Sequence, residues 1–231
     1  MSTFIVHDIE TSPAPDRAAW LVSFCADEAY PGAPSNYKKP EALERHLNEW
    51  LQEQDDRAMT AWGKTALDSV DGRIVCVCAL ACDETGKVLR VFEETTETIS
   101  EAELLTRWWS WCAGYTRRTW VGHYASTFDL PMLWRRSWLL GVRPPRPPGG
   151  WTDIVDTREL WQVSRANRDH IKLSRLAKAF GLDPKLEDDR YPHAWEAAVA
   201  GDWAWVLDRC RSDVEITAEL WRRMTGRVGE P

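Results

Sequence analysis

The most constraining feature of the sequence is one dense apolar run. Residues 73–82 read RIVCVCALAC, and every residue after the arginine is apolar. Such a run is typical of a strand buried in the core of a sheet. The turn residues Asp83–Gly86 follow it and lead into a second β-rich run, KVLRVFEE. We therefore predict a β-hairpin that supplies the second and third strands of a larger sheet.

Helices and strands alternate along the rest of the chain. The expected strands are residues 3–8 and 119–123, and residues 153–160 are expected to form an edge strand that runs into a turn. The expected helices are residues 40–54, 100–112, 129–141, 172–182 and 202–226. Pro40 and Pro131 stand in the first turns of two helices, and Ser100 with Glu103 forms a capping box. Residues 12–70 form an insertion that carries its own helix. The order of the elements predicts an α/β fold, a mixed sheet flanked by helices.

Composition limits the possible partners. The 231 residues suffice for one sizeable domain with an insertion, and we treat residues 1–231 as a single domain. A formal net charge of -7 argues against binding to nucleic acid or anionic lipid through bulk positive charge. Contact with nucleic acid must then be local or assisted by cations. Because no apolar run is long enough to cross a bilayer, we expect a cytoplasmic protein without membrane contact.

The cysteines and tryptophans are interpreted as packing residues. Six cysteines without the regular spacing of a secreted disulfide framework agree with a reducing compartment. Cys76, Cys78 and Cys82 lie in the apolar run, where no turn brings sulfurs together, and we interpret them as core side chains rather than metal ligands. The 15 tryptophans fall mostly within helical patterns, for which core packing is the expected role.

Acidic side chains at the end of the first strand indicate chemistry. Asp8 and Glu10 are two residues apart in TFIVHDIETS, so they project from the same face of the strand. Two carboxylates this close repel each other unless burial neutralises one or a divalent cation holds both. Oxygen ligands without His or Cys companions favour Mg²⁺ or Mn²⁺ over zinc. A solvated strand end is the alternative for this short motif alone.

Two more acidic residues stand where packing does not require them. Asp129 follows a strand in VGHYASTFDLPML and lies at the start of a helix. Asp213 adjoins the apolar stripe of the last helix, where a carboxylate is unfavourable unless it is paired or binds a metal. Both are therefore candidate site residues.

These motifs resemble the three successive motifs of the DnaQ-like DEDD exonucleases, which have the ribonuclease H-like fold. Asp8 and Glu10 in HDIET, Asp129 in GHYASTFDLPML and Asp213 in CRSDVEIT occur in the family's order. The insertion and the segment from KLSRLAKAFGL to the last helix are similar to free-standing relatives of the proofreading domains of family-B DNA polymerases. The resemblance covers most of the chain, so it implies a ribonuclease H-like fold.

The resemblance implies a 3′-to-5′ exonuclease that uses two divalent ions, Mg²⁺ or Mn²⁺. In this mapping Asp8 bridges both ions, Glu10 and Asp213 complete the shell of the first ion, and Asp129 supports the second. Glu10 is also a candidate contact of the terminal 3′-hydroxyl. The expected partner is the 3′ end of single-stranded or frayed DNA, and the sequence identifies no protein partner.

Residues beside the motifs are candidate substrate contacts. They are Thr11, Tyr124, Phe128, Arg135 and Arg136. Arg135 and Arg136 form a basic cluster with Arg143 and Arg146. Phosphate contact and a solvated helix face are equal alternatives for this cluster. His7 and His123 adjoin site acids in sequence, but we assign both to structural roles, with His7 pointing to the opposite face of the sheet.

The sequence departs from the family pattern at the position that orients the attacking water. Members carry Tyr four residues before the last Asp or His five residues before it, and this chain has Arg209 and Asp208 there. Arginine keeps its proton near neutral pH, and Asp208 would add negative charge, so the water-orienting residue is unassigned. Tyr191 and His193 are more consistent with surface or capping roles. Tyr124 replaces the Asn that relatives usually carry.

Two alternative functions remain open. One is an RNA-trimming 3′-5′ exonuclease on the same fold, since no residue recognisably reads a 2′-hydroxyl. The other is a catalytically weakened module that binds nucleic-acid ends, motivated by Arg209 at the water-orienting position. The presence of all four acidic residues favours an active enzyme.

Overall fold

The protein is described by a computed structural model that covers residues 2–115, 117–145, 153–163, 170–183 and 190–227. The chain divides into two compact units. Met1–Thr11 and Ile74–Pro231 make up the first unit, and Ser12–Arg73 make up the second. The first unit contains all four acidic residues singled out above.

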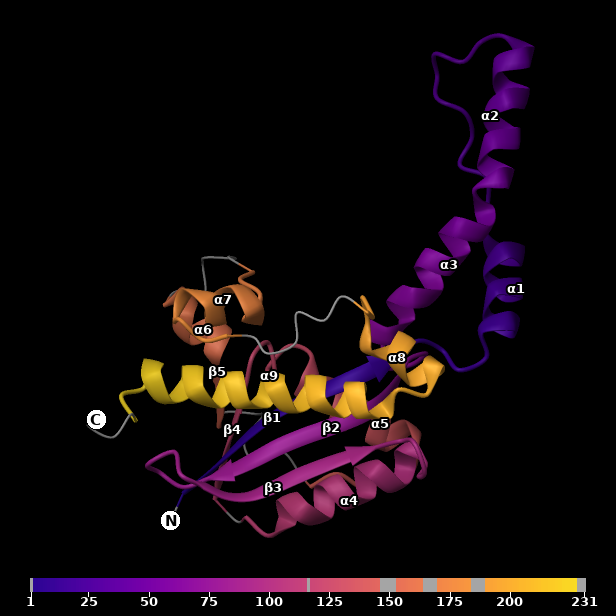
Figure 1. Cartoon of the computed structure of the whole chain (residues 1–231). Coiled ribbons are helices and arrows are strands. Elements are labelled where there is room, and N and C mark those ends of the chain that lie inside the picture. The colour runs from indigo at the N-terminus through magenta and orange to yellow at the C-terminus, as the bar shows by residue number, and fades with distance from the viewer. Residues whose placement is uncertain (1, 116, 146–152, 164–169, 184–189, 228–231) are drawn as a thin grey trace. The chain divides into compact units, whose positions relative to one another are not determined.

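A mixed five-stranded sheet is the centre of the first unit in the described part of the chain (Figure 1). Its strands are β1 (Thr3–Ser12), β2 (Arg73–Cys82), β3 (Val88–Thr95), β4 (Arg118–Gly122) and β5 (Ile154–Asp156). Their order across the sheet is β3-β2-β1-β4-β5. The pairs β1–β4 and β4–β5 are parallel and β2–β3 is antiparallel, which confirms the predicted mixed sheet.

The hairpin of β2 and β3 is confirmed. Cys76 of β2 is paired with Thr95 of β3, and Cys78 with Glu93. The Asp83 carboxylate accepts the backbone N–H groups of Thr85 at 2.9 Å and Lys87 at 3.0 Å, and so stabilises the turn.

Helices cover both faces of the sheet. They are α4 (Glu101–Ala113), α5 (Asp129–Leu139), α6 (Thr157–Gln162), α7 (Leu173–Ala179), α8 (Ala194–Ala200) and α9 (Trp203–Met224). Figure 1 shows α4 and α9 on opposite sides of the sheet. Ile5 packs with Trp108 of α4 and Leu133 of α5 in one core cluster, whereas Phe4 packs with Trp221 of α9 in another. None of the described helices is long and apolar enough to cross a membrane.

The predicted helix caps are present. Ser100 accepts the N–H of Glu103 at 3.2 Å, while the Glu103 carboxylate binds Arg107 at 2.7 Å instead of returning to Ser100. Asp202 accepts the N–H of Trp205 at 3.2 Å and begins the last helix as predicted. Half of the expected capping box is therefore formed.

Some predicted boundaries were wrong. β1 continues to Ser12 instead of ending at Asp8, so Asp8 and Glu10 lie within the strand. Residues 157–162 form helix α6 where an edge strand and turn were expected, because Asp156 ends β5 and caps a helix. Residues 194–200 form α8, a helix that the sequence did not predict.

The second unit contains more helix than the sequence predicted. Its helices are α1 (Arg17–Asp27), α2 (Pro40–Gln52), α3 (Gln54–Lys64) and the 3-10 turn η1 (Thr65–Leu67). Only α2 was expected. Glu28 binds Arg57 through two hydrogen bonds of 2.8 and 3.1 Å, which link the end of α1 to α3. Such a long-range contact stabilises helices that could not be predicted from the Pro- and Ala-rich sequence.

Candidate active site

The four predicted acids come from three elements. Asp8 and Glu10 lie on β1, Asp129 is the first residue of α5, and Asp213 lies in the middle of α9. Carboxylate oxygens of Asp8, Glu10 and Asp213 all lie within 4.8 Å of one another. The charge of Asp129 raises the pKa of Asp8. The fold therefore brings all four residues into one neighbourhood, which we call the acid cluster.

Strand alternation explains why the β1 acids meet α9. Phe4 and Val6 pack in the cluster that contains α9 residues. Asp8 and Glu10 continue this face of the strand, because successive side chains alternate. His7 points the other way, as predicted, and its ring lies 5.6 Å from the Trp120 ring. Burial lowers the pKa of His7 to about 4, so His7 is neutral near pH 7.

Burial and mutual repulsion raise the pKa of every acid in the cluster. Desolvation followed by the charges of Asp129, Asp213 and Glu10 raises the pKa of Asp8 well above its usual range. Desolvation raises the pKa of Glu10 to about 8, against the lowering effect of Arg209. Desolvation also raises the pKa of Asp129 to about 7. The cluster is therefore unfavourable in its fully ionised form unless positive charge is added.

The chemistry of these donors fits Mg²⁺ or Mn²⁺. Carboxylate oxygens that converge within 4.8 Å match the hard ligands that these ions prefer. Asp129 is 4 % exposed, and the nearby backbone of Ile9 on β1 opposes the rise of its pKa that burial causes. A bound divalent ion would remove the repulsion that raises these pKa values.

Arg209 lies at the acid cluster. Its Nε is 3.2 Å from Glu10 Oε1, and its guanidinium carbon is 5.5 Å from the centroid of the Trp205 ring. Its charge opposes the rise in pKa of both Glu10 and Asp213. Asp208 instead accepts a hydrogen bond from Arg211 at 2.5 Å. The residues at the two expected water-orienting positions are thus both engaged in ion pairs.

We expect Arg209→Gln to tighten Mg²⁺ binding by about fivefold, because a competing positive charge worth roughly 1 kcal/mol is removed. Isothermal titration calorimetry measures this affinity. Arg211→Gln is the matched control, since Arg211 binds Glu93 at 2.6 Å on the hairpin rather than the acid cluster. Equal affinities for Arg209→Gln and the unsubstituted protein would show that the guanidinium does not compete with the ion.

The loop before Asp129 makes a close turn after β4. A Cβ atom at Gly122 would collide with the Ala125 side chain, so the backbone approach requires glycine. Tyr124 has a φ of 70°, a left-handed conformation that Asn adopts more readily than Tyr. The guanidinium carbon of Arg158 lies 3.9 Å from the centroid of the Tyr124 ring.

Asp156 is a site-supporting acid that the sequence analysis missed. It is 2 % exposed, and its carboxylate accepts the backbone N–H groups of Tyr124 at 3.0 Å, Ser126 at 3.3 Å and Arg158 at 3.0 Å. Its charge contributes to the raised pKa of Asp129. The available signal was an Asp directly before a predicted turn, which is also typical of a helix cap.

We expect Asp156→Ala to lower the free energy of unfolding by about 3 kcal/mol, because three backbone donors lose their acceptor. Urea denaturation measures the change. Asp156→Asn keeps one acceptor oxygen and should cost about 1 kcal/mol. If the two variants are equally stable, the hydrogen bonds to the loop are not what Asp156 contributes.

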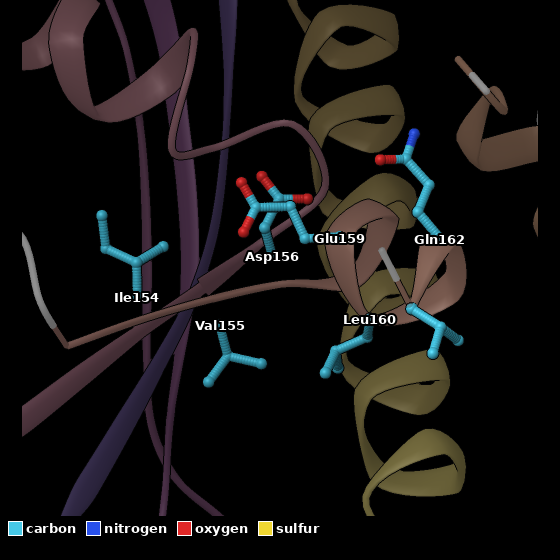
Figure 2. Close-up of a pocket in the computed structure, with 7 residues that line it drawn as sticks. Ile154, Val155, Asp156, Glu159, Leu160 and Gln162 are labelled. Carbon is cyan, nitrogen blue, oxygen red and sulfur yellow. The ribbon is translucent and has the colours of Figure 1, made fainter. Parts of the chain in front are cut away.

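A separate hollow lies beside this residue. Figure 2 shows Asp156 and Glu159 at the edge of a cavity of about 270 Å³ that Ile154, Val155 and Leu160 also line. The Ser126 hydroxyl contacts both carboxylates, at 3.1 and 3.2 Å. The acids of the cluster are not among the described lining residues, so this cavity is distinct from the acid cluster.

The predicted substrate contacts have different surroundings. Thr11 and Phe128 are half-buried next to Glu10 and Asp129 in the chain, and Tyr124 is 37 % exposed. Arg135 and Arg143 are exposed, and Arg146 lies outside the described residues. Arg136 donates to Glu101 at 2.7 and 2.9 Å in a largely buried ion pair. Because its guanidinium is engaged with Glu101, Arg136 is no longer counted among the candidate substrate contacts.

The other polar candidates have structural partners. His123 contacts the Thr157 hydroxyl and the Ile171 carbonyl, each at 3.0 Å. Tyr191 packs against Trp205 with the ring centroids 5.3 Å apart, and His193 is the residue before the first turn of α8. These contacts agree with the structural roles expected for all three residues.

Three cysteines meet next to the acid cluster. Cys76 and Cys78 of β2 are buried, as predicted, and so is Cys210 of α9. Their sulfur atoms all lie within 4.8 Å of one another. The sequence analysis considered only a turn within the strand, whereas the third sulfur comes from the helix packed on the strand. Cys82 is buried outside this group.

The comparisons with known proteins agree with this architecture. The fold is similar to that of exonuclease I, with a TM-score of 0.50 and 11 % identity over 98 % of this chain and 42 % of that one. It is also similar to the family B DNA polymerase of Pyrobaculum calidifontis, with a TM-score of 0.52 and 15 % identity over 95 % of this chain and 24 % of the polymerase. The chain thus spans less than half the length of either protein.

A third solved structure, E. coli exonuclease I in complex with a dT13 oligonucleotide, matches with a TM-score of 0.50 and 12 % identity over 98 % of this chain and 42 % of that one. No curated protein sequence matches the chain significantly. The model of a family described as a predicted 3′-5′ exonuclease related to the exonuclease domain of PolB matches residues 66–188, more than half of the chain. The chain therefore belongs to this family of PolB-related 3′-5′ exonucleases.

Proposed function

We propose that this protein is a metal-dependent 3′-to-5′ exonuclease that hydrolyses phosphodiester bonds at the 3′ ends of single-stranded or frayed DNA. The observation that carries the proposal is the convergence of carboxylates from β1, α5 and α9, each with a raised pKa. Acids that repel one another are stable in their ionised form only with added positive charge. Membership of the PolB-related exonuclease family supports the same activity.

The acid cluster would hold two Mg²⁺ or Mn²⁺ ions. Glu10 and Asp213 would bind the first ion and Asp129 the second, with Asp8 shared between them. The short separation of Asp8, Glu10 and Asp213 supports this division, and Asp129 lies outside that group of three. When bound, the ions supply activation of the attacking water and stabilisation of the leaving 3′ oxygen.

Hydrolysis adds water across the bond between phosphorus and the 3′ oxygen. The shortened strand keeps a 3′-hydroxyl, and the released nucleotide keeps the phosphate. In this step the carboxylates of the acid cluster would hold the ions that orient the reacting groups. Arg209 cannot accept a proton, so it contributes positive charge and no base.

DNA is the proposed substrate because the fold is similar to that of exonuclease I, for which a complex with a dT13 oligonucleotide is known. The net charge of -7 makes a cation-assisted contact with the strand the expected mode of binding. The ion pair between Arg209 and Glu10 favours one alternative, a module that binds nucleic-acid ends without cleaving them.

A nuclease assay tests the proposal. The purified protein is incubated with Mg²⁺ or Mn²⁺ and with 5′-labelled single-stranded DNA and RNA of the same sequence. We expect a descending ladder on DNA that is absent with a chelator. A ladder on RNA alone would replace the DNA proposal by the RNA-trimming alternative, and tight binding without products would support the end-binding module. A circular DNA substrate should stay intact, because it has no 3′ end.

A further inference from the structure

The thiols of Cys76, Cys78 and Cys210 form a second group of metal-ligand atoms. The two strand residues are two positions apart on β2, so their side chains share the face that α9 covers. The sulfur atoms of Cys76 and Cys78 are 3.9 Å apart, and all three sulfurs lie within 4.8 Å of one another. We call this group the thiol cluster.

The spacing of the thiol cluster is close to that of a tetrahedral thiolate site. Three sulfurs that each lie about 2.3 Å from one zinc-sized ion at tetrahedral angles are about 3.8 Å apart. The observed distance of 3.9 Å between Cys76 and Cys78 matches this value. Cys210 needs to move by about 1 Å or less to complete the arrangement.

Asp8 offers a fourth ligand. Its Oδ2 is 3.7 Å from the sulfur of Cys210. A carboxylate oxygen and a sulfur that bind the same zinc ion lie about 3.5 Å apart, and Oδ2 has nearly this spacing to Cys210. Asp8 is not part of the group of sulfurs that lie within 4.8 Å of one another, so its carboxylate would have to move closer to Cys76 and Cys78 on binding. The thiols are buried, whereas Asp8, Glu10 and Asp213 are half-buried. The acid cluster is therefore the more exposed of the two groups.

We infer that Cys76, Cys78, Cys210 and Asp8 form a binding site for one thiophilic divalent cation of the Zn²⁺ or Cd²⁺ type. Any thiol that still carries its proton releases it to solvent on binding, and the oxidation state of sulfur does not change. Hard ions such as Mg²⁺ prefer oxygen ligands and leave the thiols unoccupied. The two clusters are thus selective for different ions and share Asp8.

Sharing of Asp8 has a consequence that rests on the proposed nuclease function. A soft cation at the thiol cluster withdraws the carboxylate that the proposed function assigns to both hard ions. Micromolar Zn²⁺ should then inhibit the nuclease in the presence of Mg²⁺, and Cys78→Ser should relieve the inhibition. Binding to the thiols is measured independently of this activity.

Titration of the reduced protein with Cd²⁺ tests the site directly. Thiolate coordination to cadmium gives an ultraviolet charge-transfer band that carboxylates do not give. We expect the band to saturate at one ion per chain with the intensity of three thiolates. Zn²⁺ should displace the cadmium and abolish the band, and cadmium NMR of the same sample should report sulfur with oxygen ligands.

Cysteine variants locate the site. Cys78→Ser and Cys210→Ser should each weaken Cd²⁺ binding at least about tenfold. Removal of a residue that only hydrogen-bonds to a metal ligand already weakens binding by about this factor, and loss of a ligand itself should cost no less. Cys82→Ser is the matched control, because Cys82 is also buried on β2 but lies outside the thiol cluster. Circular dichroism verifies the fold of each variant.

Absence of the cadmium–thiolate band in the unsubstituted protein would overturn the inference, whatever the cysteine variants show. A band with the intensity of two thiolates, or one lost equally in Cys82→Ser, would overturn it as well. If Cd²⁺ binds as expected but no nuclease activity is found, the thiol site stands and the proposed function fails.

Discussion

Asp8→Asn should abolish nuclease activity and at the same time make the metal-free protein more stable at pH 9. Loss of the shared ligand removes about 4 kcal/mol of transition-state stabilisation, which corresponds to a rate reduced about a thousandfold. The amide keeps the size of the side chain but carries no charge. It therefore relieves the desolvation and the repulsion from Asp129, Asp213 and Glu10 that raise the pKa of Asp8.

The gain in the free energy of unfolding is expected to be about 2 kcal/mol, because an unpaired buried charge is removed. Single-turnover cleavage of labelled DNA measures the rate, and urea denaturation with a chelator measures stability. Asp213→Asn should behave in the same way. Glu215→Gln is the matched control, since Glu215 is an exposed residue of α9 two positions further along. An Asp8→Asn protein that still cleaves DNA at a comparable rate would exclude the assigned role.

Mg²⁺ should stabilise the protein far more at pH 8.5 than at pH 6.5, by about 3 kcal/mol. The pKa values of Glu10, about 8, and of Asp129, about 7, are raised above those of the unfolded chain. A carboxyl group with a raised pKa in the folded state contributes stability at low pH and loses it as the pH rises through the folded value. Without metal, these two groups therefore destabilise the protein between about pH 6.5 and 8.5, and a bound ion removes that loss.

The measurement is the difference in unfolding free energy with and without saturating Mg²⁺ at each pH. In this difference, the pH-dependent contributions of groups that do not contact the ion cancel. One such group is Cys78, whose pKa of about 5 would stabilise the fold as the pH rises. The window starts at pH 6.5 because below it the buried neutral His7, with a pKa of about 4, loses its contribution. A metal effect that is independent of pH would mean that the ion does not displace protons from these carboxyl groups.

Local sequence patterns predicted the strand and the helix that carry three of the four acidic residues. The alternation of β1 placed Asp8 and Glu10 on one face and His7 on the other, and the structure has this arrangement. The apolar stripe of α9 predicted a long helix with Asp213 at its edge, as observed. Both patterns depend on contacts between near neighbours, for which period and burial are sufficient information.

The missed features depend on contacts between distant residues. Helices α1 and α3 belong to a unit stabilised by the Glu28–Arg57 ion pair. No local sequence pattern predicted these two helices. Asp156 was interpreted as part of an edge strand, whereas it holds the loop that begins 32 residues before it. The hydrogen bonds of a buried carboxylate are set by the packing of other elements, which a sequence window does not contain.

The sequence by itself predicted the mixed sheet, the succession of its strands along the chain and the four acids, and it left the water-orienting residue unassigned. The tertiary structure decided which side chains meet. It paired Arg209 with Glu10, and it brought Cys210 to Asp8, 202 residues away, and to the two cysteines of β2. The physical reason is that strand and helix periods fix only the face on which a residue lies. Which residues share a face in space depends on how α9 packs across the sheet.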